Sequence, residues 1–365
     1  MRPCTEAELA EAIRAATGPV AVRGGGTRGL PGAGAVLETG GLSGVRLYEP
    51  GALTLVAGAG TPLAEVEAVL AAERQRLAFE PPDLRALLGR TGVSTLGGVA
   101  AENASGPRRV QAGAARDAML GLRCVDGTGA VIANGGRVMK NVTGYDLVKL
   151  LAGSRGSLGV LTEVAFKVQA VPEAETTLVG EGFSPEAGLA ALRSALGSPF
   201  DVSGAAYAGG QVLIRVEGMA GSVAYRAGQV RARIAGDWRL AEAAESAAIW
   251  QGVRDVAALA GKPGALWRIS CVPGEALAVP QALAAARVPH EALWDWGGGL
   301  LWLACPEGRG ALIRSALGAR GHATRLRGEE SSPVLPPVSP EVAALQAGLK
   351  AQFDPRGILN PGSLG

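Results

Sequence analysis

Residues 135–168 read GGRVMKNVTGYDLVKLLAGSRGSLGVLTEVAFKV, and this stretch decides the fold class. Residues 143–147 (TGYDL) predict the start of a short helix, and residues 160–168 predict an apolar strand. The loop between them, residues 153–159 (GSRGSLG), carries a glycine at every third position. Each ordered glycine costs conformational entropy, so this density indicates that backbone amides approach a large, partly anionic group.

A second glycine-dense loop lies near the N-terminus, at residues 23–27 (RGGGT). Gly24, Gly26 and Gly29 match the pattern G-x-G-x-x-G, but residues 30–34 (LPGAG) cannot form the helix that a Rossmann site requires. We therefore interpret the loop as a nest of successive N–H groups around a pyrophosphate. A plain surface turn is the alternative, and the loop at residues 153–159 makes it the weaker one.

Composition argues against several classes of protein. A chain of 365 residues that is 48% hydrophobic can form two domains, or one domain with a large insert. The net charge of +2, without a basic run that contains aromatics, argues against a nucleic-acid partner. The sequence shows no apolar leader and no run of about 18 apolar residues. It therefore predicts neither secretion nor a membrane-spanning helix, and a cytoplasmic location fits.

The cysteines and histidines are few and scattered. Cys4, Cys124, Cys271 and Cys305 form no C-x-x-C pair, which predicts no disulfide scaffold and no zinc site. The chain also lacks a ligand set for an iron–sulfur cluster, so any such cluster is expected in a partner. With only two histidines, well separated, a His-rich metal site is not expected.

The secondary-structure pattern predicts an α+β fold. A capping box begins a first helix at residue 5, and a strand at residues 20–22 runs into the glycine loop. From residue 173, strand and helix patterns mix without strict alternation, and a last helix is expected at 342–353. Other expected features are strands at 36–38, 53–57, 121–125 and 131–133, a turn at 126–129 and a proline-rich linker at 329–340.

Taken together, these motifs resemble the FAD-binding domain of the vanillyl-alcohol oxidase family, the PCMH-type flavoproteins. The pattern TGYDL…GS-x-G-S-L-G-V-L-T-E is specific to that family and occurs in its 2-hydroxyacid branch. Over almost the whole chain, the sequence is similar to the FAD-binding E subunits of glycolate oxidases. Five further motifs carry that similarity: residues 80–82 (EPP), 106–109 (GPRR), 266–270 (LWRIS), 295–298 (DWGG) and 321–325 (GHATR).

The resemblance implies three parts and a function. Residues 1–172 would be a PCMH-type FAD-binding domain of two α+β subdomains, and residues 173–328 an α+β cap domain with an antiparallel sheet. Residues 329–365 would be a linker and a helix that returns to the FAD domain. The implied activity is that of an FAD-dependent oxidoreductase subunit that helps to oxidise glycolate, a 2-hydroxyacid, to glyoxylate. The implied partners are a sister flavoprotein subunit and an iron–sulfur subunit, through which the chain would reach the inner membrane.

The resemblance also implies which segments contact FAD. The glycine loops would hold the pyrophosphate, residues 95–103 a second phosphate and the ribityl chain, residues 82–83 the adenosine, and residues 140–145 the flavin ring. The alternatives are a helix packed through small residues at 95–103, a solvated Lys140 and a core tyrosine at position 145. The expected contacts are Arg23, Gly24, Gly25, Gly26, Thr27, Pro82, Asp83, Thr95, Leu96, Gly97, Gly98, Asn103, Gly106, Lys140, Asn141, Tyr145, Gly156, Leu158, Gly159, Val160 and Asn360.

The flavin is expected to be held without a covalent bond. Several relatives attach it through a histidine in the first glycine loop, where this chain has Thr27. The two histidines, His290 and His322, lie far from that loop in sequence. Cys124 falls in a strand that is expected to be buried, which favours an inert core thiol over a flavin attachment.

Two residues of the expected cap domain are candidates for catalysis. Arg268 lies inside the apolar strand LWRIS, and a buried arginine needs a carboxylate, either from the protein or from a 2-hydroxyacid. The resemblance implies that cap arginines bind the substrate carboxylate, and His322 is the candidate base for the hydroxyl proton. Arg108 and Arg109 can pair with a phosphate or a carboxylate, or face a partner subunit, and the sequence does not separate these alternatives.

Three functional hypotheses compete. Catalytic D-type subunits carry a His-x-His metal pair and a later Glu-His, which this sequence lacks, so a subunit that depends on its partners is the leading hypothesis. The second is a stand-alone FAD-dependent 2-hydroxyacid dehydrogenase, in which Arg268 binds the substrate and His322 deprotonates it. The third is a non-catalytic scaffold that keeps the flavin fold, and the intact glycine loops rank it last.

Overall fold

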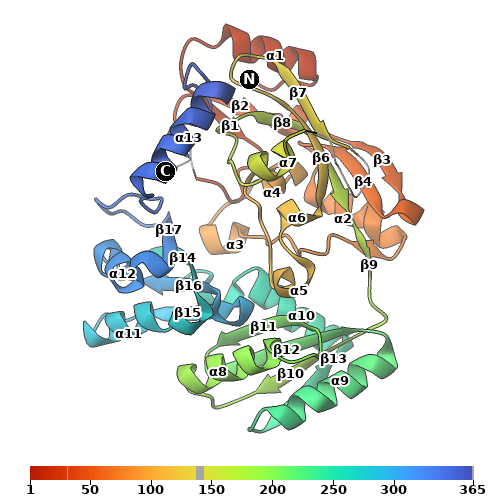
Figure 1. The fold of residues 1–365 in the computed structure, drawn as a ribbon, viewed down its shortest axis with the longest axis vertical. Coiled ribbons are helices and arrows are strands. Elements are labelled where there is room, and N and C mark those ends of the chain that lie inside the picture. The colour runs from red at the N-terminus through yellow and green to blue at the C-terminus, as the bar shows by residue number, and fades with distance from the viewer. Residues whose placement is uncertain (31, 137–143, 364–365) are drawn as a thin grey trace.

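The computed structural model describes residues 1–30, 32–136 and 144–363 (Figure 1). We call residues 1–172 the N-terminal region and residues 173–328 the cap region. The N-terminal region forms the upper part of Figure 1 and the cap region the lower part. The described strands form a five-stranded sheet, an eight-stranded sheet and two two-stranded sheets. Because helices and antiparallel sheets occur together throughout, the predicted α+β class is confirmed.

The N-terminus forms a small parallel sheet beside the first helix. Helix α1 (Glu6–Ala15) begins after Thr5, whose side chain accepts a hydrogen bond from Glu8 N–H at 3.1 Å, so the predicted cap is confirmed. Strand β1 (Val20–Arg23) pairs in parallel with β2 (Ala35–Glu38). The first glycine loop therefore leaves directly from the end of β1.

Strand β8 (Val160–Lys167) is the centre of the five-stranded sheet, whose order is β3-β4-β8-β6-β7 with antiparallel neighbours. Most of its residues are buried, as expected for an apolar run between two covered faces. Because the second glycine loop ends where β8 begins, that loop is fixed to the middle of the sheet. The other elements of this region are β3 (Val45–Glu49), β4 (Thr54–Gly58), β5 (Gln75–Arg76), β6 (Met119–Val125), β7 (Val131–Gly135), β9 (Gln169–Ala170), α2 (Leu63–Ala72), α3 (Arg85–Leu88), α4 (Leu96–Ala101), α5 (Arg109–Ala112), α6 (Ala115–Ala118) and α7 (Leu147–Leu151).

Two local predictions in this region can be compared with the structure. The turn predicted at residues 126–129 joins β6 and β7, and the Asp126 carboxylate accepts hydrogen bonds from the N–H groups of Thr128 and Ala130. The short helix predicted from TGYDL is α7, which begins at Leu147 after a cap by Asp146. Residue 143, where that motif starts, lies outside the described residues.

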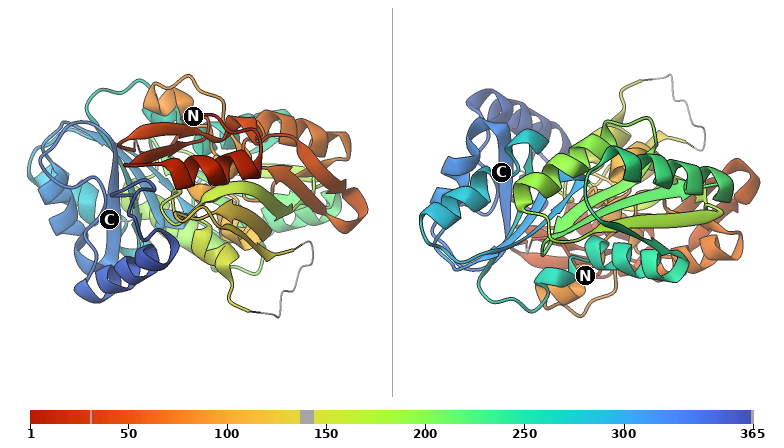
Figure 2. Two further views of the ribbon diagram at one scale, coloured as in Figure 1. Left: turned by 90° about the horizontal axis from the view of Figure 1, so that it is seen from above. Right: turned by 90° about the horizontal axis from the view of Figure 1, so that it is seen from below.

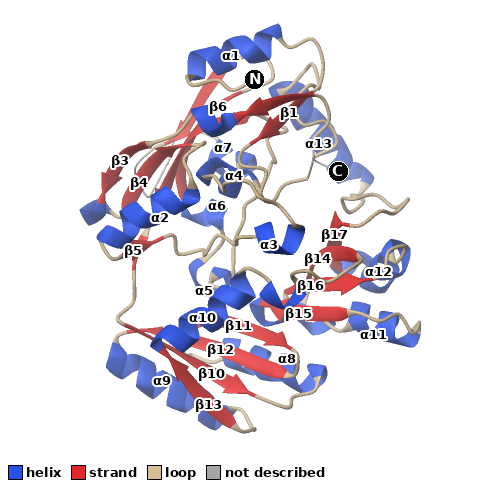
Figure 3. Ribbon diagram, turned by 180° about the vertical axis from the view of Figure 1, so that it is seen from behind, coloured by secondary structure: helices blue, strands red, loops and turns tan. Residues whose placement is uncertain are grey.

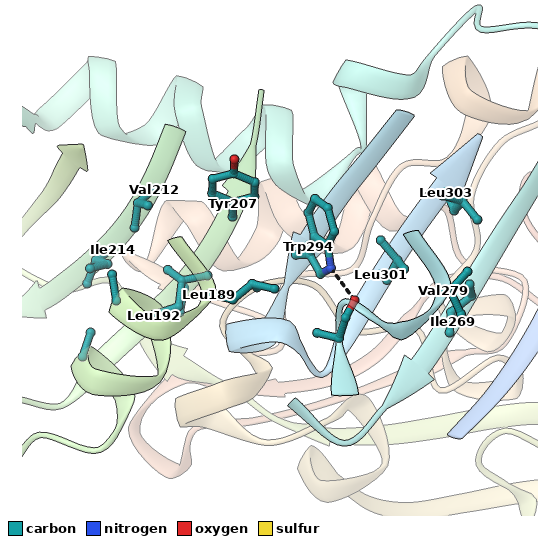
Figure 4. Packing of buried hydrophobic residues seen from close by; sticks show 14 of the residues in the cluster. Leu189, Leu192, Tyr207, Val212, Ile214, Ile269, Val279, Trp294, Leu301 and Leu303 are labelled. Atoms are coloured by element: carbon teal, nitrogen blue, oxygen red, sulfur yellow. Dashed lines mark hydrogen bonds between the residues drawn. The ribbon is translucent and has the colours of Figure 1, made fainter. Parts of the chain in front are cut away.

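The cap region is one antiparallel sheet in the order β13-β10-β12-β11-β15-β16-β14-β17, with helices along it (Figure 2). Apolar residues of α8, α9, α11 and α12 pack on one face of this sheet. In the close view of that core, Leu189 and Leu192 of α8 lie against strand residues, and Trp294 Nε1 donates a hydrogen bond to Ala276 O at 2.9 Å (Figure 4). The elements of the cap region are β10 (Ala174–Gly180), β11 (Val202–Ala208), β12 (Gln211–Gly218), β13 (Trp238–Glu242), β14 (Ala265–Cys271), β15 (Glu291–Asp295), β16 (Leu300–Cys305), β17 (Gly321–Arg327), α8 (Pro185–Leu196), α9 (Ala220–Arg233), α10 (Ala243–Arg254), α11 (Ala278–Ala285) and α12 (Gly310–Leu317).

The other face of the cap sheet points toward the N-terminal region. Leu266, Leu300 and Trp302 on this face share a hydrophobic core with Trp250 of α10 and Leu87 of α3. Figure 3 shows α3 and α10 between the five-stranded and eight-stranded sheets. Because α3 belongs to the N-terminal region, the two regions bury apolar surface against each other.

A tail returns from the cap region to the N-terminal region. Helix α13 (Pro340–Phe353) begins two residues before the predicted limit of 342 and ends where predicted. Its residues Leu349 and Phe353 pack against the core of the five-stranded sheet. Beyond it, Leu359 forms a parallel bridge with Val20 of β1. The tail therefore lies beside the start of the first glycine loop.

Candidate functional site

A cavity of about 510 Å³ lies in the N-terminal region, beside the tail. Its wall is built from the first glycine loop, the segments 89–92 and 95–102, the second glycine loop and residues of the tail. The two glycine-dense loops, remote in sequence, therefore meet at one cavity. The expected contact residues that line it are Arg23, Gly24, Gly25, Gly26, Thr27, Thr95, Gly97, Gly98, Gly156, Gly159 and Asn360.

Close packing between the segments of the wall requires some of these glycines. A Cβ atom on Gly25 would lie 1.4 Å from the carbonyl oxygen of Val93, and one on Gly97 would lie 2.6 Å from the Cβ of Ala59. Both distances are far below van der Waals contact, so only glycine lets these backbones approach each other. The glycine density predicted close approach to a ligand. The structure adds a second cause, which is contact between the backbones of the wall itself.

The first glycine loop presents backbone amides without acceptors. The N–H groups of Gly25, Gly26 and Thr27 donate no hydrogen bond to the described residues, and neither does that of Gly156 in the second loop. Buried or half-buried amides normally have a partner. These groups are therefore available to an anion or to water in the cavity, which is the arrangement expected of an anion-binding nest.

The N-terminus of α4 differs from its expected role. We expected its N–H groups to bind a second phosphate, but protein atoms already accept from all three groups of the first turn. Leu96 N–H donates to Thr61 O, Gly97 N–H donates to Ala59 O, and Gly98 N–H donates to the Thr95 hydroxyl at 3.3 Å. The structure thus corrects this expectation: α4 shapes the wall with its glycines, while its first turn has no free amide for an anion.

Asn360 of the tail ties the two glycine loops together. Its Oδ1 accepts a hydrogen bond from Val22 N–H at 2.7 Å, and its Nδ2 donates to Arg155 O at 2.7 Å. Val22 precedes the first glycine loop, and Arg155 lies inside the second. One buried amide side chain therefore sets the distance between the two loops.

Charged side chains in the wall make the cavity electropositive. It is lined by Arg23, Arg28, Arg90 and Arg155, against one carboxylate, Glu102. Arg155 Nε lies 3.4 Å from Glu102 Oε2. Burial raises the pKa of Glu102, while Arg155 and Arg28 act in the opposite direction. Four guanidinium groups and one carboxylate suit a polyanionic ligand.

Sequence reasoning missed most of these charges. It selected Arg23 but not Arg28, Arg90, Arg155 or Glu102. Arg155 could have been found, because it stands inside the second glycine loop, next to residues that were selected. Arg28 and Arg90 carry no motif of their own, since their place in the wall depends on how distant segments fold together.

Several expected contacts do not line the cavity. Leu96, Leu158 and Val160 are core residues of the N-terminal region. Tyr145 was expected either to contact the flavin ring or to lie in the core. Its side chain is 88% exposed, and it takes neither position. The apolar positions that follow it in α7 take the buried sites instead. Lys140 and Asn141 lie outside the described residues.

Four further expected contacts bond to other parts of the protein. The Pro82 carbonyl and the Asp83 carboxylate accept hydrogen bonds from arginine side chains. Asn103 Oδ1 accepts from a backbone N–H of α6 at 2.9 Å. Gly106 O accepts from the Trp296 indole at 3.0 Å, which joins the N-terminal region to the cap region. These residues support the site from behind its wall.

The catalytic candidates Arg268 and His322 lie on the cap face that points toward the N-terminal region. In the β14–β17 register Arg268 faces Thr324 and Ser270 faces His322, so the two candidates are diagonal neighbours on one face of the sheet. Arg268 shares this face with Trp302, to which its guanidinium lies 5.9 Å from the ring centroid. Neither candidate lines the 510 Å³ cavity.

Arg268 lacks the protein carboxylate that a buried arginine was expected to need. No described carboxylate lies within ion-pair distance of it. Burial lowers the pKa of Arg268 to about 10, and the cations Arg109 and Arg155 act in the same direction, while the Glu102 carboxylate acts in the opposite one. His322 is only partly covered. Its partial burial, Arg268 and Arg155 together lower its pKa below the usual 6.5.

A second cation joins Arg268 across the region boundary. Arg109 of α5 lies 4.6 Å from the Trp296 ring centroid, and Arg268 lies 5.5 Å from the same ring. Trp296 belongs to the cap region and is held by the bond to Gly106 O. One indole thus gathers an arginine from each region, and neither arginine has an ion pair among the described residues.

Arg108 has a different role from both of its predicted ones. It is buried, and its guanidinium contacts Glu217 at 2.8 Å and Glu80 at 3.0 Å. Arg76 also pairs with Glu217, and Arg215 also pairs with Glu80. The guanidinium of Arg108 is therefore already paired with carboxylates of the protein. It joins the N-terminal region to β12 of the cap through an internal cluster of charges.

The chain was compared with known proteins. Residues 1–134 match the family described as FAD binding domain, and residues 334–364 match the family described as FAD linked oxidases, C-terminal domain. Over 351 residues, the chain is 35% identical to glycolate oxidase subunit GlcE of Escherichia coli (strain K12), covering 95% of this chain and 92% of the relative. The chain belongs to the FAD-linked oxidase family.

Other relatives of this FAD-linked oxidase are similar over shorter stretches. Glycolate oxidase subunit GlcD of Bacillus subtilis (strain 168) is 41% identical over 101 residues, which is 28% of this chain and 21% of the relative. The D-lactate dehydrogenase of Archaeoglobus fulgidus is 35% identical over 157 residues, covering 41% and 33%. A solved alkyldihydroxyacetonephosphate synthase superposes with a TM-score of 0.70 at 15% identity, over 99% of this chain and 75% of that chain. The PCMH-type fold is therefore confirmed.

FAD fits the cavity of this FAD-linked oxidase. The free amides of the glycine loops and the four wall arginines suit two phosphate groups. No histidine stands among the described lining residues. Cys124 is buried behind Gly159, and burial raises its pKa to about 12, so its thiol stays protonated. These features suit a flavin that is held without a covalent bond.

None of the helices in residues 1–30, 32–136 and 144–363 has the length and apolar character needed to cross a membrane. The His, Cys, Asp and Glu side chains of the described residues nowhere gather in threes in a way that could hold a metal ion.

Proposed function

We propose that this chain is the FAD-binding subunit of a glycolate oxidase complex. It takes part in oxidising glycolate to glyoxylate and passes the electrons to an iron–sulfur subunit. The observation that carries this proposal is the end-to-end similarity to GlcE, which spans both regions and the tail. Relatives that match over shorter stretches and are named for lactate and 2-hydroxyglutarate support a 2-hydroxyacid as the substrate class.

The charges at the region boundary suit a small 2-hydroxyacid. Arg268 and Arg109 are cations without ion pairs among the described residues, and they meet at Trp296. A substrate carboxylate supplies the anion that they lack. In this proposal Arg268 binds that carboxylate, and Arg109 adds positive charge from the opposite region.

His322 is the proposed base for the substrate hydroxyl. Its lowered pKa keeps the imidazole neutral at neutral pH, so its free nitrogen can take a proton. Bound FAD would accept the hydride from the substrate Cα, which leaves glyoxylate as the product. The protein residues orient the carboxylate and hold the proton. Glu102 and Arg155, which line the cavity, act electrostatically on Arg268.

The proposal includes partners for a chemical reason. The scattered cysteines provide no cluster ligands, so electrons must leave through another chain or a soluble acceptor. The relatives named as glycolate oxidase subunits support a sister flavoprotein subunit and an iron–sulfur subunit. We place the complex in the cytoplasm. In this proposal the chain reaches the inner membrane only through those partners.

The test compares the chain alone with the assembled complex. The purified chain, loaded with FAD, is assayed for glycolate-dependent reduction of an artificial acceptor, and the assay is repeated after co-expression with the two partner subunits. We expect high turnover only in the assembly. High turnover of the isolated chain would instead favour the stand-alone dehydrogenase. A colourless chain that takes up no FAD would favour the scaffold.

A further inference from the structure

Three motifs of the sequence, GPRR, LWRIS and DWGG, meet at the indole of Trp296. The Trp296 Nε1 donates a hydrogen bond to Gly106 O at 3.0 Å, across 190 positions of the chain. The same ring lies 4.6 Å from the guanidinium carbon of Arg109 and 5.5 Å from that of Arg268. None of these four residues lines the 510 Å³ cavity, so flavin binding does not account for their meeting.

The backbone of Trp296 is strained in a way that fixes the direction of its side chain. Trp296 lies in the turn between β15 and β16 and has a φ of +54°, which is unfavourable for a bulky residue. Gly297 and Gly298 continue the turn at +63° and +101°, which glycine adopts without cost from a Cβ. The buried Asp295 carboxylate accepts a hydrogen bond from Trp296 N–H at 2.7 Å and holds this conformation. Such strain persists where the surroundings impose it, and it gathers at functional sites.

The ring stabilises two arginines that repel each other. Arg109 acts to lower the pKa of Arg268, which is the sign of repulsion between two cations. The face of an indole attracts a guanidinium, so the ring offsets part of that repulsion. The other aromatic neighbour of Arg268, Trp302, lies farther away, at 5.9 Å. A guanidinium that is already held in place loses less freedom when an anion binds, and binding is stronger for that reason.

We propose that Trp296 is a positioning residue of the substrate site, whose ring holds Arg268 and Arg109 in place before a substrate carboxylate arrives. This inference rests on the proposed function, in which Arg268 binds that carboxylate. Trp296 acts through the two arginines, so the face of its ring is the part that matters for anion binding. Its indole N–H anchors the ring to the N-terminal region through Gly106 and is the less important part.

The test measures the binding of oxalate to the FAD-loaded chain by titration calorimetry. Oxalate carries the carboxylate of glycolate but has no hydrogen on carbon, so it cannot lose a hydride to the flavin. In Trp296→Leu, which lacks an aromatic face, we expect the dissociation constant for oxalate to rise roughly fivefold to thirtyfold. In Trp296→Phe, which keeps a ring face and loses only the N–H, the constant should rise less than about threefold.

Two further variants complete the test. Tyr225→Leu removes a ring of α9 that is 64% exposed, and it should bind oxalate as the wild type does. Arg268→Ala should weaken the binding of oxalate at least as much as Trp296→Leu does. If Trp296→Leu does not fold, Trp296→Met, which also lacks a ring, replaces it.

The outcomes separate this inference from the proposed function. If the wild type binds no oxalate, or if Arg268→Ala binds it unchanged, the carboxylate contact of the proposed function is refuted and this inference with it. If Arg268→Ala weakens binding but Trp296→Leu does not, only the role of Trp296 is refuted. The same holds if Trp296→Phe loses as much affinity as Trp296→Leu, because the ring face would then not hold the site.

Discussion

The buried charge network between the two regions gives the sharpest prediction of stability. Glu217 of β12 accepts hydrogen bonds from Arg76 Nη1 at 2.8 Å, from Arg108 Nε at 2.8 Å and from Arg108 Nη2 at 2.9 Å. Arg215 lies 3.5 Å from the same carboxylate. The substitution Glu217→Gln keeps the shape of the side chain but removes its negative charge. Arg108 and Arg215 then keep Glu80 as an ion-pair partner, while Arg76 keeps none among the described residues.

The expected loss follows from these contacts. Glutamine retains one carbonyl oxygen, while its NH₂ group meets an arginine N–H where the second carboxylate oxygen was. Breaking a buried ion pair by removing one partner costs about 3 to 5 kcal/mol, because the other charges remain buried. We expect Glu217→Gln to lower the free energy of unfolding by that amount. The surface change Glu245→Gln, which breaks an exposed pair with Arg239, should cost less than about 1 kcal/mol.

Urea unfolding of the FAD-loaded chain, followed by tryptophan fluorescence, measures both variants. Trp250 is a suitable reporter because Arg215 of the network stacks on its ring at 4.5 Å. Burial acts to raise the pKa of Glu217, but Arg215 and Arg108 outweigh it and hold that pKa well below 4.5. The stability contributed by this carboxylate is therefore present above about pH 4.5 and is lost as pH falls through the lower folded value. A loss below about 1 kcal/mol at neutral pH would refute the reasoning, because it would mean that removing the carboxylate leaves no uncompensated buried charge.

Three further predictions concern the site. Arg268→Ala should raise the KM for glycolate in the assembled complex roughly tenfold to a hundredfold, measured by steady-state kinetics, and an unchanged KM discards the carboxylate contact. For the complex, kcat/KM should rise with pH through a pKa below 6.5, and a pH–rate profile of His322→Gln should lack that rise if His322 is the base. Gly25→Ala places a methyl group 1.4 Å from Val93 O, so it should lower the free energy of unfolding by about 3 kcal/mol and release flavin. Gly51 has open space around it, so the control Gly51→Ala should melt at the temperature of the wild type.

The meeting of the two glycine loops was predictable because each loop carries a motif of the family that the sequence resembles. Each loop follows or precedes a strand whose apolar pattern is clear, and the density of glycine marks close approach of backbones. The sequence did not show whether a ligand or another backbone segment approaches each glycine. At Gly25 and Gly97 the near neighbour is another segment of the wall, which no pattern around either residue reveals.

The fate of the charged residues was not predictable from sequence. Arg108 bonds Glu80 and Glu217, which lie 28 and 109 residues away along the chain, so its role appears only after the regions pack together. Arg28 was missed for the same reason, since its burial depends on Pro82 and Ser94. The order of strands in the cap sheet also depends on such long-range pairing, and the sequence predicted only that mixed strands and helices would form it.

The bond between Asn360 and Val22 spans 338 positions of the chain and has a consequence for biosynthesis. A nascent polypeptide that still lacks residue 360 can form the five-stranded sheet, yet it lacks the side chain that bonds to both glycine loops. We therefore expect the tightest capture of the flavin only after the ribosome has translated the tail. We expect the product of a message cut short before that codon to hold less flavin, and so to be paler, than the full chain.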